Sequence, residues 1–216
     1  ILGVLAIFMK SEVTSCDISA AFCYSKVPDG SQTWVKAPPG FTFEVDGQHY
    51  TEALLQRELY GLRTAPLQWY KEFSTTIQSF DPEIKISQMD PCLFYKEKPG
   101  FHFYNLTHVD DSFTVCSDPL YRQKFHQHIA QHYKAKFWVK PSQFLGMNLS
   151  YSDGGIHLNQ TAQIEQLCKD FGVTLPASPP TTPMSTNYKP GCSSPDDLPS
   201  WPFSQINGGL GYIVRC

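Results

Sequence analysis

Two adjacent aspartates, Asp110 and Asp111, lie in a stretch whose pattern otherwise predicts a β-strand. The stretch is YNLTHVDDSF, residues 104–113, with Val109 before the pair and Phe113 close behind it. Carboxylates are poor strand formers, and burying one without a partner costs free energy. A chain reversal at the pair would put both carboxylates at the tip of a hairpin. Taken alone, the pair is better explained as an ordinary turn, in which aspartate bonds nearby backbone amides.

A third aspartate completes a set of ligands that suits divalent cations. EVTSCDIS, residues 12–19, is rich in β-branched residues and predicts a strand that ends near Asp17. Two strand ends would then bring Asp17 to Asp110 and Asp111. Two-metal phosphoryl transfer holds its cations ~3.5–4 Å apart, and Mg²⁺ prefers carboxylate and phosphate oxygens. Asp17 alone is also explained as a cap or a turn residue.

The remaining pattern mixes strands and helices. Asp46-Gly47 between aromatic-rich arms predicts a hairpin. Further strands are predicted over residues 90–97, 101–109, 111–117, 144–151 and 155–159. Helices are predicted over residues 65–80, 118–137, 161–173 and 204–214. Residues 1–8 form an apolar segment of either type, and residues 176–202, with eight of the seventeen prolines, predict a linker or strap.

Charge and composition narrow the function classes. A net charge of −3 gives no global basic field, which argues against a free-standing nucleic-acid binder but less against one piece of a larger assembly. Seven cysteines without a CxxC pair argue against a zinc ribbon and favour a reducing compartment. The apolar start is too short to span a bilayer and lacks a basic n-region, so we expect no membrane association and no secretion.

Seven segments of the chain, in order, resemble copia-type reverse transcriptases of LTR retrotransposons. CDISAAF resembles the family's first catalytic motif, WVKAPPGF its Y-M-x-Q-P-x-G-F segment, and HVDD its Y-V-D-D box. ELYGLRTAPLQWY is similar to S-L-Y-G-L-K-Q-A-P-R-Q-W-Y, the most diagnostic string. DPCLFYK, FLGMNLS with IHLNQTAQIEQL, and TTPM with FSQINGGLGYI match later segments. The resemblance covers nearly all of the chain.

The resemblance implies an α+β fold with a polymerase palm-like antiparallel sheet, helices packed on one face, and a C-terminal helical or strap extension. Residues 1–140 would be the palm with residual fingers elements. Residues 141–175 would be the primer-grip hairpin and the start of the thumb, and residues 176–216 a Pro-rich strap and truncated connection segment. We expect the N-terminal fingers segment and the RNase H domain to be missing.

The same resemblance assigns the catalytic and nucleotide-binding residues. Asp17, Asp110 and Asp111 would be the catalytic carboxylates and the ligands of two Mg²⁺ ions, which Mn²⁺ can replace. Phe22 corresponds to the steric gate that excludes a 2′-hydroxyl, with a plain core residue as the alternative. Four residues would bind the nucleotide beside the templating base pair, although a helix start also explains them: Gly61, Arg63, Ala65 and Pro66.

Primer contacts and a general acid complete the expected site. His108 stands where the family usually has tyrosine beside the primer end. Leu145, Gly146 and Met147 correspond to the primer grip. Lys140 is the candidate general acid that protonates the leaving pyrophosphate.

The predicted function is that of an RNA-directed DNA polymerase domain of a retrotransposon polyprotein, adding dNTPs to a primer 3′-hydroxyl. Its partners would be an RNA or DNA template and primer, dNTPs, and the integrase and RNase H domains. Cytoplasmic virus-like particles and the nucleus are the expected locations. The alternative is a truncated, inactive remnant that at most binds nucleic acid. A generic metal-dependent hydrolase is more remote, because no positioned general base for water is evident.

Overall fold

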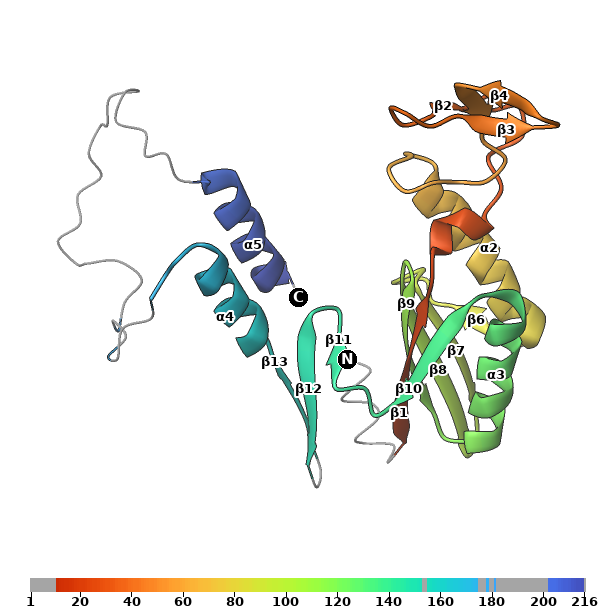
Figure 1. Ribbon diagram of the computed structural model, residues 1–216. Coiled ribbons are helices and arrows are strands. Elements are labelled where there is room, and N and C mark those ends of the chain that lie inside the picture. Colours follow the sequence, from red (N-terminus) through yellow and green to blue (C-terminus); the bar gives the residue numbers. More distant parts are fainter. Residues whose placement is uncertain (1–10, 153–154, 175–177, 179–180, 182–201, 216) are drawn as a thin grey trace. The chain divides into compact units, whose positions relative to one another are not determined.

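The structure is a computed structural model that describes residues 11–152, 155–174, 178, 181 and 202–215 (Figure 1). The predicted apolar segment at residues 1–8 and nearly all of the predicted strap lie outside the described residues. The chain forms two compact units: residues 1–141 with 153–156, and residues 142–152 with 157–216.

Among the described residues, a six-stranded antiparallel sheet with the order β10-β1-β9-β8-β7-β6 forms the centre of the first unit. Its strands are β1 (Glu12–Ile18), β6 (Lys85–Ile86), β7 (Leu93–Lys98), β8 (Phe101–His108), β9 (Asp111–Cys116) and β10 (Ala135–Val139). The predicted strands over residues 90–97, 101–109 and 111–117 are confirmed as β7, β8 and β9. The α+β prediction with an antiparallel sheet is also confirmed, whereas its identification as a polymerase palm stays a prediction.

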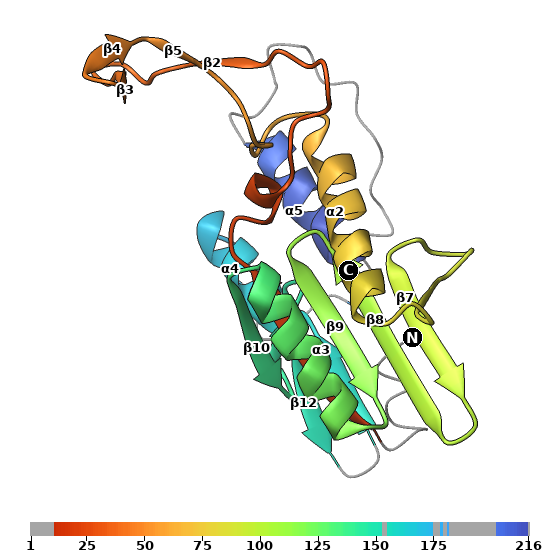
Figure 2. The same cartoon turned by 90° about the vertical axis from the view of Figure 1, so that its right-hand side faces the viewer.

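Two helices, α2 (Ala65–Phe80) and α3 (Pro119–His132), cover one face of this sheet (Figure 2). The helix α2 buries a stripe of Trp69, Phe73 and Ile77 at four-residue spacing, which is the pattern of an amphipathic helix. The core between the layers contains Cys16, Ile18, Phe94, Phe103 and Cys116 from the strands and Phe125 and Ile129 from α3. The sheet face toward the helices is therefore apolar.

Local signals start α2 and α3 at or next to the residues where the sequence predicted these helices to begin. The helix α2 begins at Ala65 with Pro66 in its first turn, where a missing N–H costs nothing. Asp118 is the N-cap of α3, because its carboxylate accepts hydrogen bonds from the backbone N–H groups of Leu120 and Tyr121 at 2.8 and 3.2 Å.

The predicted helix over residues 118–137 is wrong in its last five residues. The helix α3 ends at His132, and Tyr133 is extended, with φ −135° and ψ 149°. Residues from Ala135 onward instead form β10, which pairs with β1. Ala135 and Phe137 pack against the core from alternate positions, so tertiary packing overrides the helical pattern here.

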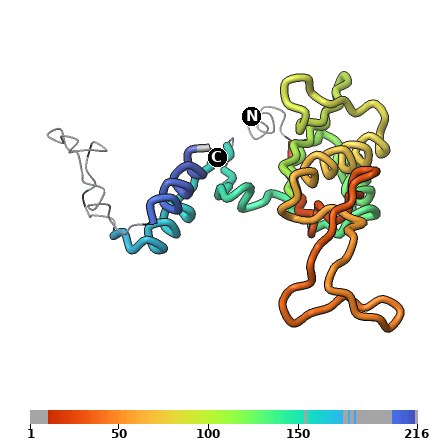
Figure 3. Tube along the Cα trace, turned by 90° about the horizontal axis from the view of Figure 1, so that it is seen from above, coloured from red at the N-terminus to blue at the C-terminus, as the bar shows by residue number. Residues whose placement is uncertain are grey.

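A short 3₁₀ helix and an arm of small strands follow β1. The 3₁₀ helix η1 spans Ala21–Tyr24. The arm, the orange segment in Figure 3, contains two small two-stranded sheets. One pairs β2 (Trp34–Lys36) with β5 (Glu52–Leu54), and the other is a hairpin of β3 (Phe43–Val45) and β4 (Gln48–Tyr50). The predicted Asp46-Gly47 hairpin is confirmed, with φ 51° and 76° at the two residues.

The second unit has its own small sheet and two helices. The sheet has the order β11-β12-β13, from β11 (Gln143–Phe144), β12 (Met147–Ser152) and β13 (Gly155–Asn159), whose first two residues are grouped with the first unit. The helices are α4 (Thr161–Asp170) and α5 (Phe203–Arg215), both as predicted. Within the described residues, no helix has the length and apolar character needed to cross a membrane.

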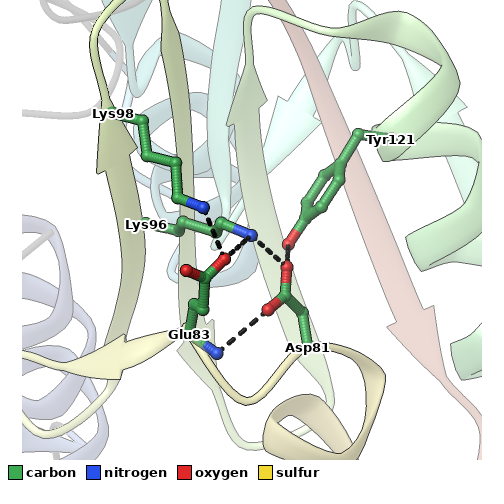
Figure 4. Close-up of polar contacts among 5 residues, drawn as sticks. All are labelled: Asp81, Glu83, Lys96, Lys98 and Tyr121. Atoms are coloured by element: carbon green, nitrogen blue, oxygen red, sulfur yellow. Dashed lines mark hydrogen bonds and ion pairs between the residues drawn. The ribbon is translucent and has the colours of Figure 1, made fainter.

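A polar cluster joins the end of α2 to β7 (Figure 4). The Lys96 ammonium lies between the carboxylates of Asp81 and Glu83, with 2.8 Å to Glu83, and the Tyr121 hydroxyl donates to Asp81 at 2.8 Å. Burial alone would raise the pKa of Asp81, but hydrogen bonds from Lys96, the Glu83 backbone and Tyr121 more than offset it and lower this pKa. The side chains of Lys96 and Asp81 are only 11 % and 15 % exposed, so their pairing is shielded from water.

Replacing Lys96 tests the contribution of this cluster to stability. We expect Lys96→Met to lower the free energy of unfolding at pH 7 by about 1–3 kcal/mol, because it leaves Asp81 without its cation. A carboxylate with a lowered folded-state pKa stabilises the fold above its unfolded pKa and stops doing so as the pH falls through the folded value. The difference between wild type and variant, measured by urea unfolding, should therefore shrink on acidification.

Lys98→Met is the matched control for this measurement. Lys98 pairs with Glu83, at 2.6 Å, and both side chains are at least half exposed, so its loss should lower the free energy of unfolding much less than the loss of Lys96. Equal losses in the two variants would contradict a special role for Lys96.

Candidate active site

Four strand ends bring Lys136, Asp17, Asp111 and His108 into one row across the sheet. Asp17 is the Cα partner of Lys136 on β10 and of Asp111 on β9, and Asp111 is the partner of His108 on β8. Side chains alternate along a strand, and Cys16 and Ile18 point into the core, so Asp17 lies on the face away from the helices. Directly opposed residues share a face, with Cα atoms ~4.5–5.5 Å apart.

Asp110 lies in the tight turn that joins β8 to β9. His108 and Asp111 are the last paired residues, so Val109 and Asp110 alone form the loop. Val109 has φ 55°, in the left-handed region. The backbone N–H of Ile18 donates to the Asp110 carbonyl at 2.9 Å, which ties the turn to the end of β1. The predicted hairpin with both carboxylates at its tip is confirmed.

Asp111 lies within the electrostatic influence of the other two aspartates. Burial, followed by the charges of Asp110 and Asp17, raises the pKa of Asp111, and His108 opposes this shift. Burial raises the pKa of the Cys16 thiol to about 12, with Asp17 and Asp111 adding to the effect. Cys16 is therefore a neutral core thiol at pH 7, and the negative charge of the site comes from the carboxylates.

The donor set suits a hard cation, although its side chains do not converge. Carboxylate oxygens at one sheet edge are the ligands that Mg²⁺ prefers. Among the described residues, however, no group of three or more His, Cys, Asp or Glu side chains is placed to hold a metal ion. Like charges repel, so carboxylates converge only where a cation offsets their repulsion. Asp17, Asp110 and Asp111 thus have the oxygen donors that such an ion prefers and neighbouring places in the strand register, but they are not arranged around one point.

Phe22 lies beside this row in a ring pair that the sequence did not reveal. The chain turns sharply after β1, with φ 54° at Ala20, and η1 then carries Phe22. Its ring lies 4.7 Å from the ring of Tyr60, centroid to centroid. Burial and then the charge of Asp110 raise the pKa of Tyr60, so its hydroxyl is close to the aspartates. Phe22 also packs against the core, so both of its predicted roles are compatible with its position.

The other predicted nucleotide-binding residues surround the start of α2. Gly61 has φ 98°, a conformation that disfavours side chains, although a Cβ there would meet no neighbour. Arg63 and Pro66 are exposed, whereas Ala65 is fully buried at the first position of the helix. The exposed pair is accessible to a ligand, and Ala65 serves packing.

The predicted general acid lies away from the aspartates. The backbone N–H of Lys140 donates to the Val13 carbonyl at 2.9 Å, four residues before Asp17 on β1. At the rise of an extended strand this separation is roughly 13 Å. Lys136, by contrast, lies directly opposite Asp17 and is exposed.

The predicted primer-grip residues belong to the second unit. Leu145 and Gly146 form the loop between Phe144 and Met147, with φ 48° and 73°. The hydroxyl of Tyr212 on α5 donates to the Leu145 carbonyl at 3.0 Å. A Cβ on Gly146 would lie 2.9 Å from that hydroxyl, so only glycine fits there without a shift of Tyr212.

Three residues around the site were missed or underestimated in the sequence. Tyr60 could have been noticed as the aromatic before Gly61. Lys136 was concealed by the helix predicted over residues 118–137. Trp69 is a core residue, 3 % exposed, and its indole N–H also donates to the Val109 carbonyl at 2.6 Å. A contact between residues 40 positions apart leaves no local signal in the sequence.

Known proteins resemble this chain over almost its whole length. A family model described as "Reverse transcriptase (RNA-dependent DNA polymerase)" matches residues 1–186. The retrovirus-related Pol polyprotein from transposon TNT 1-94 of Nicotiana tabacum is 27% identical over 222 residues, 98% of this chain and 16% of that protein. The corresponding polyprotein from transposon RE1 of Arabidopsis thaliana is 28% identical over 215 residues, 99% of this chain and 14% of that protein.

A shorter relative matches in part. The putative transposon Ty5-1 protein of Saccharomyces cerevisiae is 27% identical over 139 residues, 64% of this chain and 43% of that protein. The chain thus spans only 14% to 16% of the length of the two plant polyproteins.

Proposed function

The chain belongs to the reverse transcriptase (RNA-dependent DNA polymerase) family, as its resemblance to retrotransposon enzymes predicted, and we propose that its aspartate row catalyses templated DNA synthesis. The observation that carries this proposal is the register that sets Asp17 opposite Asp111, with Asp110 in the adjoining turn. The reaction is attack of a primer 3′-hydroxyl on the α-phosphate of a dNTP, with release of pyrophosphate.

Asp17 and Asp110 are the proposed principal ligands of two Mg²⁺ ions, and Asp111 completes the acidic site. When bound, such ions activate the attacking hydroxyl and neutralise charge on the phosphates. The protein supplies position: two strands and a turn bonded to β1 hold the carboxylates at one edge of the sheet. Positioning and electrostatic stabilisation account for most of the acceleration in phosphoryl transfer.

The Phe22–Tyr60 ring pair is the proposed wall beneath the sugar of the incoming nucleotide. An aromatic ring against the C2′ position leaves no room for a hydroxyl, which selects deoxyribonucleotides. The exposed Arg63 is available for a phosphate, and Gly61 permits close backbone approach. The two rings are tilted by 48° and do not stack flat on each other. Replacing Phe22 therefore changes the shape of this wall.

The remaining roles stay predictions. His108 is proposed beside the primer end, and Leu145 to Met147 as the primer grip. Lys140 keeps its predicted role as general acid. Lys136 is the alternative for this role, and its place opposite Asp17 in the strand register supports it. The partners and locations are likewise proposals. The proposed partners are template, primer, dNTPs and the integrase and RNase H domains, and the proposed locations are the cytoplasm and the nucleus.

Primer extension tests the proposed activity. We expect the wild-type chain to extend oligo(dT) on poly(rA) with dTTP and Mg²⁺ or Mn²⁺. Asp110→Asn should lower the rate by at least roughly 10²-fold, because a metal ligand contributes several kcal/mol to the transition state. Asp29→Asn, an exposed change outside the site, is the control and should keep the wild-type rate.

Two results would contradict this proposal. Extension that survives Asp110→Asn unchanged would come from another site or another protein. Binding of the primer–template without extension in the wild type would favour the inactive remnant.

Sugar selection tests the ring pair separately. We expect Phe22→Val to reduce the preference for dTTP over ribothymidine triphosphate, measured as the ratio of kcat/KM values, by roughly 10–100-fold, because the smaller side chain admits a 2′-hydroxyl. Phe41→Val, on the arm and 71% exposed in the wild type, should leave the ratio unchanged. An unchanged ratio in Phe22→Val would assign Phe22 to the core alone.

A further inference from the structure

The turn that carries Asp110 is strained and is held at both of its carbonyls. Val109 has φ 55°, and the left-handed region is unfavourable for a β-branched residue. Such conformations are unfavourable and persist only where the surroundings impose them. The indole Nε1–H of Trp69 donates to the Val109 carbonyl at 2.6 Å, and the backbone N–H of Ile18 donates to the Asp110 carbonyl at 2.9 Å.

Trp69 is a rigid donor because aromatic rings enclose it. Its ring stacks on Phe73 at 5.1 Å with 19° between the planes, and Tyr133 meets it edge-on at 5.2 Å. The Tyr133 hydroxyl is itself hydrogen-bonded to Thr76, at 2.6 Å. The indole has one polar atom, which can only donate, and that atom is committed to the turn.

We propose that Trp69 is a positioning residue that keeps the Val109–Asp110 turn in the geometry that Asp110 needs. Its catalytic part rests on the proposed function. A tryptophan that only fills a core can use any acceptor for its N–H. The acceptor of Trp69 is the carbonyl of Val109, the residue directly before the proposed metal ligand Asp110. Without this bond the strained Val109 can relax, and relaxation of Val109 rotates the peptide that it shares with Asp110.

The helix α2 extends this role to the nucleotide side of the site. Trp69 lies four residues after Ala65, one turn along the same face of the helix. Gly61 and Arg63, proposed to meet the nucleotide, lie directly before that turn. One rigid element therefore fixes both the nucleotide-facing segment and the aspartate turn, and a loss at Trp69 should impair the chemical step more than binding of the nucleotide.

A measurement independent of activity tests the hold on the turn. Amide hydrogen exchange of Ile18 reports the bond to the Asp110 carbonyl, and we expect Trp69→Phe to speed it roughly tenfold. Tyr70→Phe is the matched control: it deletes the neighbouring side-chain bond of α2, from Tyr70 to the Pro91 carbonyl at 3.1 Å, and should leave Ile18 unchanged. If Trp69→Phe does not fold, β-(3-benzothienyl)alanine at position 69 removes the N–H and keeps the ring shape.

Kinetics test the positioning role. We expect Trp69→Phe to lower kcat about 10–100-fold with KM for dTTP nearly unchanged, since a shift of about 1 Å at a reacting group costs this much. In a Val109→Gly background, Trp69→Phe should lower kcat by a several-fold smaller factor, because glycine adopts positive φ without strain and the turn then needs no hold. A role in the core alone would give equal losses in both backgrounds.

Unchanged exchange at Ile18 in Trp69→Phe, or equal kinetic losses with and without Val109→Gly, would overturn the proposal. If the wild type shows no extension, the proposed function fails and the exchange measurement decides the hold on the turn by itself.

Discussion

The antiparallel register between β1 and β9 determines where every charged group of the site lies. It opposes Asp17 to Asp111 and brings the Asp110 carbonyl to the Ile18 amide. Because side chains alternate along a strand, a slip of one residue would turn Asp17 into the core and Cys16 out of it. Burial of Cys16 and Ile18 under the helices therefore fixes the register, and the register fixes the carboxylates.

That arrangement keeps like charges together at some cost to the fold. Burial and the neighbouring carboxylates raise the pKa of Asp111, which means that its ionised form is less favourable in the folded than in the unfolded chain. The strained Val109 adds a second local cost. Both features are tolerated because the aromatic core around Trp69 and the β1 backbone hold the turn. Unfavourable features of this kind are concentrated where a site needs them.

The sequence predicted those parts of the fold that depend on local signals. The helix α2, the start of α3 and the β8–β9 hairpin follow from periodicity and turn residues, and the structure has them. β10 was missed because its alternation is short and continues a helical pattern, so only pairing with β1 reveals it. The juxtaposition of the aspartates could be predicted from strand ends, but their proposed roles came from family resemblance. The Phe22–Tyr60 and Trp69–Val109 contacts are tertiary and have no counterpart in local sequence.

Whether the aspartates form a cation site is tested most directly by the stability of Asp111→Asn with and without metal. In a chelator, urea unfolding should show the variant to be more stable than the wild type at pH 7, because it removes an unfavourable charge. In Mn²⁺ at about 100 times its Kd, the free energy of unfolding of the wild type should rise by about 2.7 kcal/mol. The wild type should then be more stable than the variant. A variant that is no more stable in chelator, or that gains as much from Mn²⁺ as the wild type, would contradict the account.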